Sequence, residues 1–101
     1  MNANATPNES AVPTLMLFVT GSAPRSRRAR KNLAAALKSL GLDSVKAMEI
    51  DLIDRPEKTV TYSVFATPAL LRMDEAGEMR VLYGDLSDES KLLEFLRDLV
   101  D

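Results

Sequence analysis

The side chains best suited to binding chemistry lie in one short basic segment. Five cations fall between positions 25 and 31, namely Arg25, Arg27, Arg28, Arg30 and Lys31. They lie in the first two turns of a predicted helix. At this end of a helix the dipole disfavours each cation by about 0.3 kcal/mol or more. Because such a locally unfavourable arrangement indicates a purpose, we interpret the segment as a surface that binds an acidic partner, with Arg27, Arg28 and Lys31 as its candidate residues.

The other reactive side chains do not form a catalytic set. The chain has no cysteine and no histidine, which removes thiol redox chemistry, the usual zinc ligands and histidine acid–base catalysis. Ser22 and Ser26 have no accompanying base, so neither is expected to act as a nucleophile. Asp51 and Asp54 are interpreted as a surface ion pair and a helix N-cap. We therefore predict no enzymatic activity, no cofactor and no metal site.

Nucleic acid is disfavoured as the partner of the basic segment. The net charge is −2, aromatic residues make up 5% of the chain, and tryptophan is absent. Nucleic-acid surfaces usually combine a strong positive charge with aromatic side chains among the cations. A nucleic-acid adaptor and a small-anion site at the helix N-terminus remain alternatives to a protein partner.

The apolar periodicity predicts an α/β domain with the element order βαβαββα. A continuous apolar run is typical of a strand buried on both faces, and a 3.6-residue stripe is typical of an amphipathic helix. The first two strands have a crossover between them that is long enough to make them parallel. Along the chain, the predicted elements are a strand at 14–20, a helix at 24–40, a strand at 44–52, a short helix at 55–62, strands at 69–73 and 78–83, and a final helix after Ser87.

Capping and turn residues predict where these elements end. Ser22 is the expected N-cap of the first long helix, with Pro24 in its first turn, and Ser87 is the expected cap of the last. Asp54 is the expected cap of the short helix. Gly41 predicts a left-handed helix stop, and residues 74–77 predict a hairpin turn.

The organisation predicted is one domain at 14–101 with a loose tail at 1–13. The tail is rich in Asn, Ala, Thr and Pro without periodicity, so it cannot bury enough apolar surface to order itself. It has no charged segment followed by an apolar core, and no apolar run approaches the roughly 20 residues needed to cross a bilayer. We expect a cytoplasmic protein without membrane contact.

Four short motifs now carry a resemblance to a known family. They are L-F-V-T-G-S-A-P-R-S (17–26), I-D-L (50–52) followed by Pro56, A-T-P-A-L (66–70) and Y-G-D-L-S (83–87). In this order they resemble the KaiB family, and their structural residues are Gly21, Pro24, Thr67, Pro68, Gly84 and Asp85. The resemblance implies a thioredoxin-like fold with a four-stranded mixed sheet and three helices. In such a fold Pro68 stands where a cis proline occurs, so cis and trans are equally expected.

The resemblance also implies a function. Members of the family are non-enzymatic domains that bind KaiC, a hexameric RecA-like ATPase, in clock or clock-like systems. The chain is similar as well to the sensor domain of KaiB-like histidine kinases, so a kinase or another clock component is a further candidate partner. Arg28 and Lys31 match basic residues of the circadian members and Arg72 matches a lysine, which adds Arg72 to the candidate partner-binding residues. The expected state is a monomer or a small homo-oligomer.

The family is known for a second fold, and this chain departs from the circadian pattern where the two folds differ. Circadian members resemble L-P-P-P-V-R-R before G-D-L-S, whereas this chain has an acidic, glycine-containing turn at residues 73–80. A proline run resists strand pairing, while such a turn favours a hairpin. Residues 89–100 are mostly good helix formers. Both features favour the thioredoxin-like state. A cysteine-free sensor of small anions, or an enzyme, at the Ser22 and Pro68 corner is the alternative within that fold.

Overall fold

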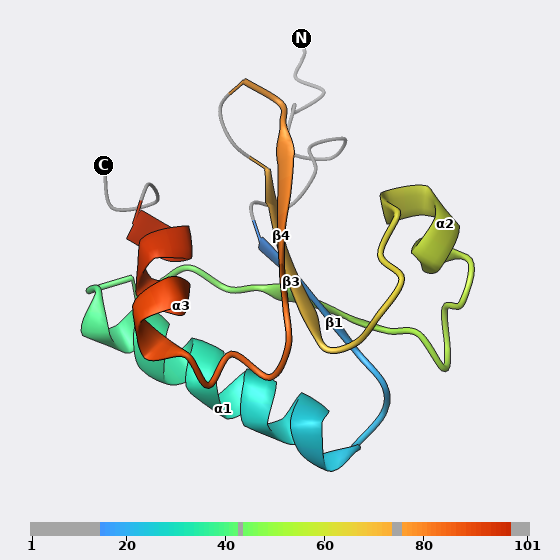
Figure 1. Cartoon of the computed structure of the whole chain (residues 1–101), viewed down its shortest axis with the longest axis horizontal. Helices are drawn as coiled ribbons and strands as arrows, with labels where there is room; N and C mark the ends of the chain where they lie inside the picture. Colours follow the sequence, from blue (N-terminus) through green and yellow to red (C-terminus); the bar gives the residue numbers. More distant parts are fainter. Residues whose placement is uncertain (1–14, 43, 74–75, 98–101) are drawn as a thin grey trace, which may run out of the picture.

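A four-stranded mixed sheet with helices on both faces organises the chain (Figure 1). The structure is a computed structural model and describes residues 15–42, 44–73 and 76–97. The predicted element order is confirmed, while the predicted tail at 1–13 lies outside the described residues. The elements are β1 (Leu15–Val19), α1 (Pro24–Ser39), β2 (Met48–Asp51), α2 (Lys58–Tyr62), β3 (Ala69–Met73), β4 (Met79–Tyr83) and α3 (Glu89–Leu96).

Strand β1 lies in the middle of the sheet, whose order is β2-β1-β3-β4. It pairs in parallel with β2, as its predicted crossover requires, and antiparallel with β3, which pairs antiparallel with β4. Every residue of β1 is buried. The continuous apolar run therefore marks a strand covered on both faces, as predicted.

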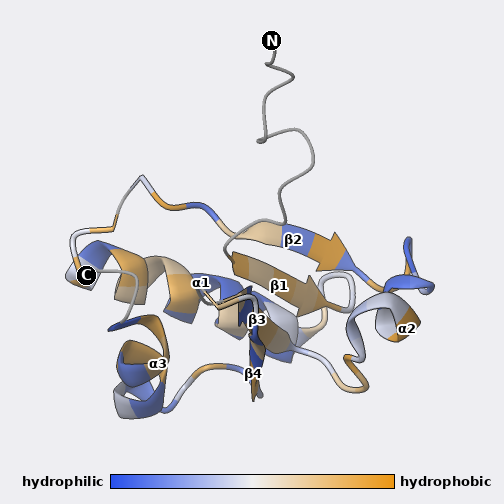
Figure 2. Ribbon diagram, turned by 90° about the horizontal axis from the view of Figure 1, so that it is seen from above, coloured by the Kyte–Doolittle hydropathy of each residue, from blue (hydrophilic) through white to orange (hydrophobic). Residues whose placement is uncertain are grey.

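Two apolar clusters cover the two faces of the sheet. Leu15, Leu17 and Val19 of β1 pack with the buried residues of α1 and α3. Met16 and Phe18 point to the opposite face, toward α2. This alternation of side chains is the normal consequence of strand geometry. Figures 1 and 2 show the two long helices on one side of the sheet and α2 on the other.

The apolar stripe predicted for α1 comprises Ala29, Leu33, Ala36, Leu37 and Leu40. Its first four residues are buried, together with Ser26, whereas Leu40 is half-buried at the C-cap. Gly41 has φ +73°, in the left-handed region that the helix stop requires. The apolar spacing of the last helix predicts a buried face of Leu92, Leu93, Leu96, Leu99 and Val100. In α3, Leu92 and Leu96 are buried and Leu93 is partly buried. Leu99 and Val100, predicted on the same face, lie outside the described residues. Among the helices described, none is long and apolar enough to cross a membrane.

Three predicted caps are wrong. The helix α1 begins at Pro24, so its N-cap is Ala23, which has no side-chain acceptor, and Ser22 does not cap it. The carboxylate of Asp88, not Ser87, accepts the N–H of Lys91 at 3.2 Å and caps α3. Asp54 does not cap α2, because backbone turns fill the segment before it and the helix starts only at Lys58.

The second strand is also shorter than the predicted 44–52. Strand β1 supplies partners from Met16 opposite Met48 to Val19 opposite Asp51, and pairing is confined to this stretch of the described residues. The predicted hairpin is confirmed, since β3 and β4 pair at five consecutive positions. Of its turn, Asp74 and Glu75 lie outside the described residues. The Thr67–Pro68 peptide bond is cis.

Candidate partner-binding surface

The exposed face of α1 carries the candidate cations. An α-helix turns by about 100° per residue. Arg27 and Lys31, one turn apart, therefore lie opposite the buried stripe, and both are exposed. Arg28 and Arg30 fall on the two flanks of the same helix. Of the five cations of the segment, Arg27 and Lys31 thus point outward, Arg28 and Arg30 lie on the flanks in ion pairs, and Arg25 is exposed in the first turn.

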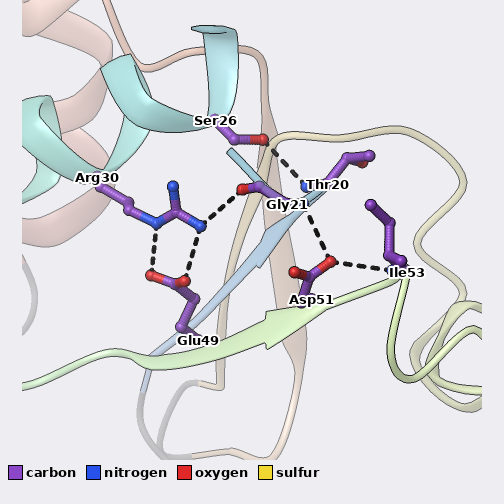
Figure 3. A network of polar contacts seen from close by, with 7 residues as sticks. All are labelled: Thr20, Gly21, Ser26, Arg30, Glu49, Asp51 and Ile53. Atoms are coloured by element: carbon purple, nitrogen blue, oxygen red, sulfur yellow. Dashed lines mark hydrogen bonds and ion pairs between the residues drawn. The ribbon is translucent and has the colours of Figure 1, made fainter. Parts of the chain in front are cut away.

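Arg30 fastens one flank of α1 to strand β2 (Figure 3). Its guanidinium donates from Nε to Glu49 Oε1 at 2.9 Å and contacts Glu49 Oε2 through Nη2 at 2.9 Å. The same Nη2 donates to the carbonyl of Gly21 at 2.9 Å. Because two parallel bonds to a carboxylate fix orientation as well as distance, Arg30 sets the spacing between α1 and β2.

Asp51 braces the turn between β1 and α1. Its Oδ1 accepts the backbone N–H groups of Gly21 and Ile53, each at 3.0 Å (Figure 3). These two bonds, that of Ile53 first, lower the pKa of the Asp51 carboxyl. The interpretation of Asp51 as part of a surface ion pair is wrong, because the neighbouring cation Arg55 pairs with Glu57 at 2.9 Å.

Asp85 joins the other flank of α1 to the loop between β4 and α3. Its Oδ2 accepts from Nε of Arg28 at 3.0 Å, and its backbone carbonyl accepts from the Asn32 side-chain amide at 3.0 Å. Its Oδ1 accepts the N–H of Ser87 at 3.1 Å, which confirms the predicted turn-ordering role. Hydrogen bonding from Ser87, and then from Arg28, lowers the pKa of Asp85 to about 2.

We expect Asp85 to make the free energy of unfolding depend on pH in the acid range. Its pKa falls from 3.8 to about 2 in the folded state, so its stabilisation is complete above about pH 4 and is lost as the pH falls toward 2. Urea unfolding at about pH 5 and about pH 2 should show a smaller loss of stability for Asp85→Asn than for the unsubstituted chain. Asp54→Asn, at an exposed aspartate, is the control and should keep the full loss. An equal loss in Asp85→Asn would contradict the assignment.

An apolar groove runs beside the outward cations, between α1 and the segment leading into β2. Its volume is about 230 Å³. Arg30 and Glu49 stand at its border, next to Lys46. Its lining residues are Leu17, Arg30, Leu33, Ala34, Leu37, Val45, Lys46, Ala47 and Glu49. The groove gives α1 a place for an apolar side chain of a partner, next to the cations that would attract it.

Arg72 does not lie on this surface. Its residue is 4% exposed, on the sheet face covered by α1 and α3, because it pairs with Leu15 of the first cluster. Its Nη1 donates to the carbonyl of Phe95 in α3 at 3.0 Å. Arg72 is therefore not accessible to a partner in this fold, since a strand side chain that points under α3 is covered by it, and a role in partner binding stays a prediction.

The predicted structural motifs gather at one end of the sheet. The turn at Gly21 and Pro24 faces the Thr67–Pro68 loop, where the hydroxyls of Thr20 and Thr67 are hydrogen-bonded. The N–H of Gly84 donates to the carbonyl of Pro68 at 2.9 Å. Gly84 has φ +111°, a conformation in which side chains are strongly disfavoured.

Sequence reasoning did not predict two of the contacts that hold the flanks of α1 against the rest of the fold. These are the contact of Arg30 with Glu49 and the contact of Asn32 with Asp85. Arg30 was visible as a cation, but the acid that pairs with it lies 19 positions away. Asn32 carried no signal, because a polar residue on an exposed helix face usually needs no partner. Only the tertiary fold brings these pairs together.

The sequence of the chain is similar to that of a known protein family. The sequence model of the KaiB family, described as the KaiB domain, matches residues 16–98. A relative from Synechococcus sp. (strain RCC307), the circadian clock oscillator protein KaiB, is 35% identical over 81 residues, which cover 78% of this chain and 71% of the relative.

Two solved structures share the fold. Fasciola hepatica thioredoxin superposes with a TM-score of 0.68 at 21% identity, covering 94% of this chain and 88% of that one. The N-terminal domain of Synechococcus elongatus SasA gives a TM-score of 0.58 at 28% identity, covering 89% and 86%. The predicted thioredoxin-like fold is confirmed.

Proposed function

Since the chain belongs to the KaiB family, we propose that it is a non-enzymatic adaptor that docks through α1 and β2 on a KaiC-like hexameric ATPase. The relative from strain RCC307 is named a clock oscillator protein, and a role in a clock or clock-like system is part of this proposal. The observation that carries the docking surface is the pair of exposed cations, Arg27 and Lys31, beside the apolar groove.

The ion pairs of Arg28 and Arg30 leave Arg27 and Lys31 as the candidate cations that a partner would meet on the outward face of α1, with Arg25 exposed in the first turn. Arg30 is occupied by Glu49 and Arg28 by Asp85, so a partner carboxylate would have to compete for either. Exposed charges steer association and select orientation, while apolar contact supplies more of the affinity. The partner surface that fits is acidic and presents an apolar side chain to the groove.

Of the two serines at the β1–α1 corner, Ser22 is exposed, whereas Ser26 is not available as a nucleophile. Ser26 is 1% exposed, and its hydroxyl accepts the backbone N–H of Thr20 at 3.0 Å (Figure 3). Its oxygen is therefore committed to the turn. Within the described residues no group of acids is placed to hold a metal ion. An adaptor uses this corner as a rigid support for α1.

A pull-down with the purified KaiC-like hexamer tests the proposal. The ATPase should be presented with ADP and, separately, with ATP, because a nucleotide-dependent ring can expose its docking surface in one state only. We expect saturable binding in at least one state. Absence of binding in both states would sink the proposal, and steep salt dependence with RNA or DNA in place of the hexamer would favour the nucleic-acid alternative.

A further inference from the structure

Strand β4 forms the outer edge of the sheet. In the order β2-β1-β3-β4, no described strand pairs with its far side. The strand is regular, since it pairs residue by residue with β3 from Met79 opposite Met73 to Tyr83 opposite Ala69. It contains no proline. A regular edge strand without a proline, and with Arg80 as its one charged residue, is a template for pairing with another strand.

The hydrogen bond between Gly84 N–H and the Pro68 carbonyl, at 2.9 Å, shows which backbone groups face outward. In an antiparallel pair, alternate residues direct both N–H and C=O toward the neighbour. Gly84 points to β3, so Leu82 and Arg80 do the same. Met79, Val81 and Tyr83 therefore direct their N–H and C=O groups away from the sheet.

The same three residues carry an apolar row on one face of β4. Their partners in β3 are Met73, Leu71 and Ala69, and Leu71 and Ala69 belong to the cluster on the α2 face. Val81 is partly buried there, whereas Met79 is 47% exposed and Tyr83 is 49% exposed. The residues of β4 whose backbone groups point away from the sheet therefore also carry apolar side chains.

We propose that β4 is a self-complementary interface, through which two copies of the chain pair antiparallel about Val81. In this register Val81 faces Val81 of the second copy, and Met79 faces Tyr83 of the second copy on both sides. Each facing pair exchanges two backbone hydrogen bonds, because all three residues direct theirs outward. The pairing joins the two sheets into one, and methionine sulfur contacts aromatic rings favourably.

The charges of β4 do not oppose a second copy as the occupant of this edge. On the opposite face of the strand, the register places Arg80 across from Leu82 of the second copy, so no like charges stand directly opposite. The other edge is different, since β2 carries Glu49 and Asp51. Because β2 and β4 lie at opposite edges, the β4 pairing leaves the α1 and β2 surface open, and the inference is independent of the function proposed above.

Charge swapping at the facing positions tests the pairing. Met79→Lys with Tyr83→Lys places lysine against lysine across the interface, and Met79→Glu with Tyr83→Glu places glutamate against glutamate. We expect sedimentation velocity, from micromolar to millimolar concentration, to show a dimer for the unsubstituted chain. Each double variant should associate at least roughly tenfold more weakly. An equimolar mixture of the two should dimerise again, because lysine then faces glutamate.

Val60→Lys is the control, since Val60 is 80% exposed on α2 and should leave dimerisation unchanged. Far-UV circular dichroism must show that both double variants are folded. A third variant, Val81→Pro, removes an outward N–H without touching the ladder to β3 and should also give a monomer. The proposal is overturned if the unsubstituted chain stays monomeric at millimolar concentration. The proposal is also overturned if each double variant dimerises by itself as strongly as the unsubstituted chain. It is overturned as well if the equimolar mixture of the two does not dimerise.

Discussion

Replacing both Arg27 and Lys31 with glutamate is expected to weaken binding of the KaiC-like ATPase at least roughly tenfold while leaving the fold intact. Both side chains are exposed on α1, beside the groove that would take the apolar contact. Reversal turns attraction to an acidic surface into repulsion, so the loss should appear mainly in the association rate. It should shrink as salt is added, because exposed charges are screened within about 10 Å at 0.1 M salt.

The same double substitution should not lower the free energy of unfolding, although it weakens binding. Arg27 lies near the positive end of α1, whose first turn carries no acidic residue. Glutamate at that position should therefore raise the free energy of unfolding slightly, by up to about 1 kcal/mol. Loss of binding by a protein that is no less stable cannot be blamed on misfolding.

Surface plasmon resonance with the immobilised hexamer would measure this effect, together with urea unfolding of each variant. Lys91→Glu with Arg97→Glu is the matched control, because it changes the net charge equally but alters two exposed cations in and just after α3, away from Arg27 and Lys31. We expect the control to bind nearly as well as the unsubstituted chain. Equal losses in both double variants would mean that net charge alone matters, and the docking surface would have to be placed elsewhere.

Local signals in the sequence were sufficient for the element order, while the thioredoxin-like fold was implied by the family resemblance. The apolar run of β1 and the stripe of α1 were read correctly, because burial on both faces and a 3.6-residue period leave distinct patterns. The turn role of Asp85 was also predicted, since an aspartate bonds to the backbone two residues on. The caps at Ser22 and Ser87 were misplaced, because capping depends on the residue at which the helix starts.

The candidate site was predictable only in part, because its geometry depends on contacts between distant residues. The sequence shows that the cations of α1 form a cluster. It does not show which of them point outward and which are held in ion pairs. Arg28 meets Asp85 57 positions away, and Arg30 meets Glu49 19 positions away. Arg72 was predicted to meet a partner because it matches a lysine of the circadian family members. Its register in β3 places it under α3 instead.

Arg72→Met is expected to lower the free energy of unfolding by about 2 kcal/mol and to leave the intrinsic affinity for the ATPase unchanged. Methionine retains much of the apolar stem of arginine, which limits the cavity. It removes the donor that reaches the Phe95 carbonyl at 3.0 Å. A hydrogen bond from a charged group is worth more than a neutral one, and the substitution removes this donor from the Phe95 carbonyl in a part-buried position.

The measurement is urea unfolding followed by circular dichroism, with binding assayed well below the unfolding midpoint. Arg80→Met is the matched control, because Arg80 faces Arg72 across the hairpin but is exposed, and it should cost clearly less stability. The two outcomes separate two roles for the same side chain. If Arg72 anchors α3 to the sheet, stability falls and binding by the folded fraction persists. If binding is lost while stability is unchanged, Arg72 must leave its place under α3 to meet the partner, as the family resemblance implied. That result would mean that α3 detaches when the complex forms.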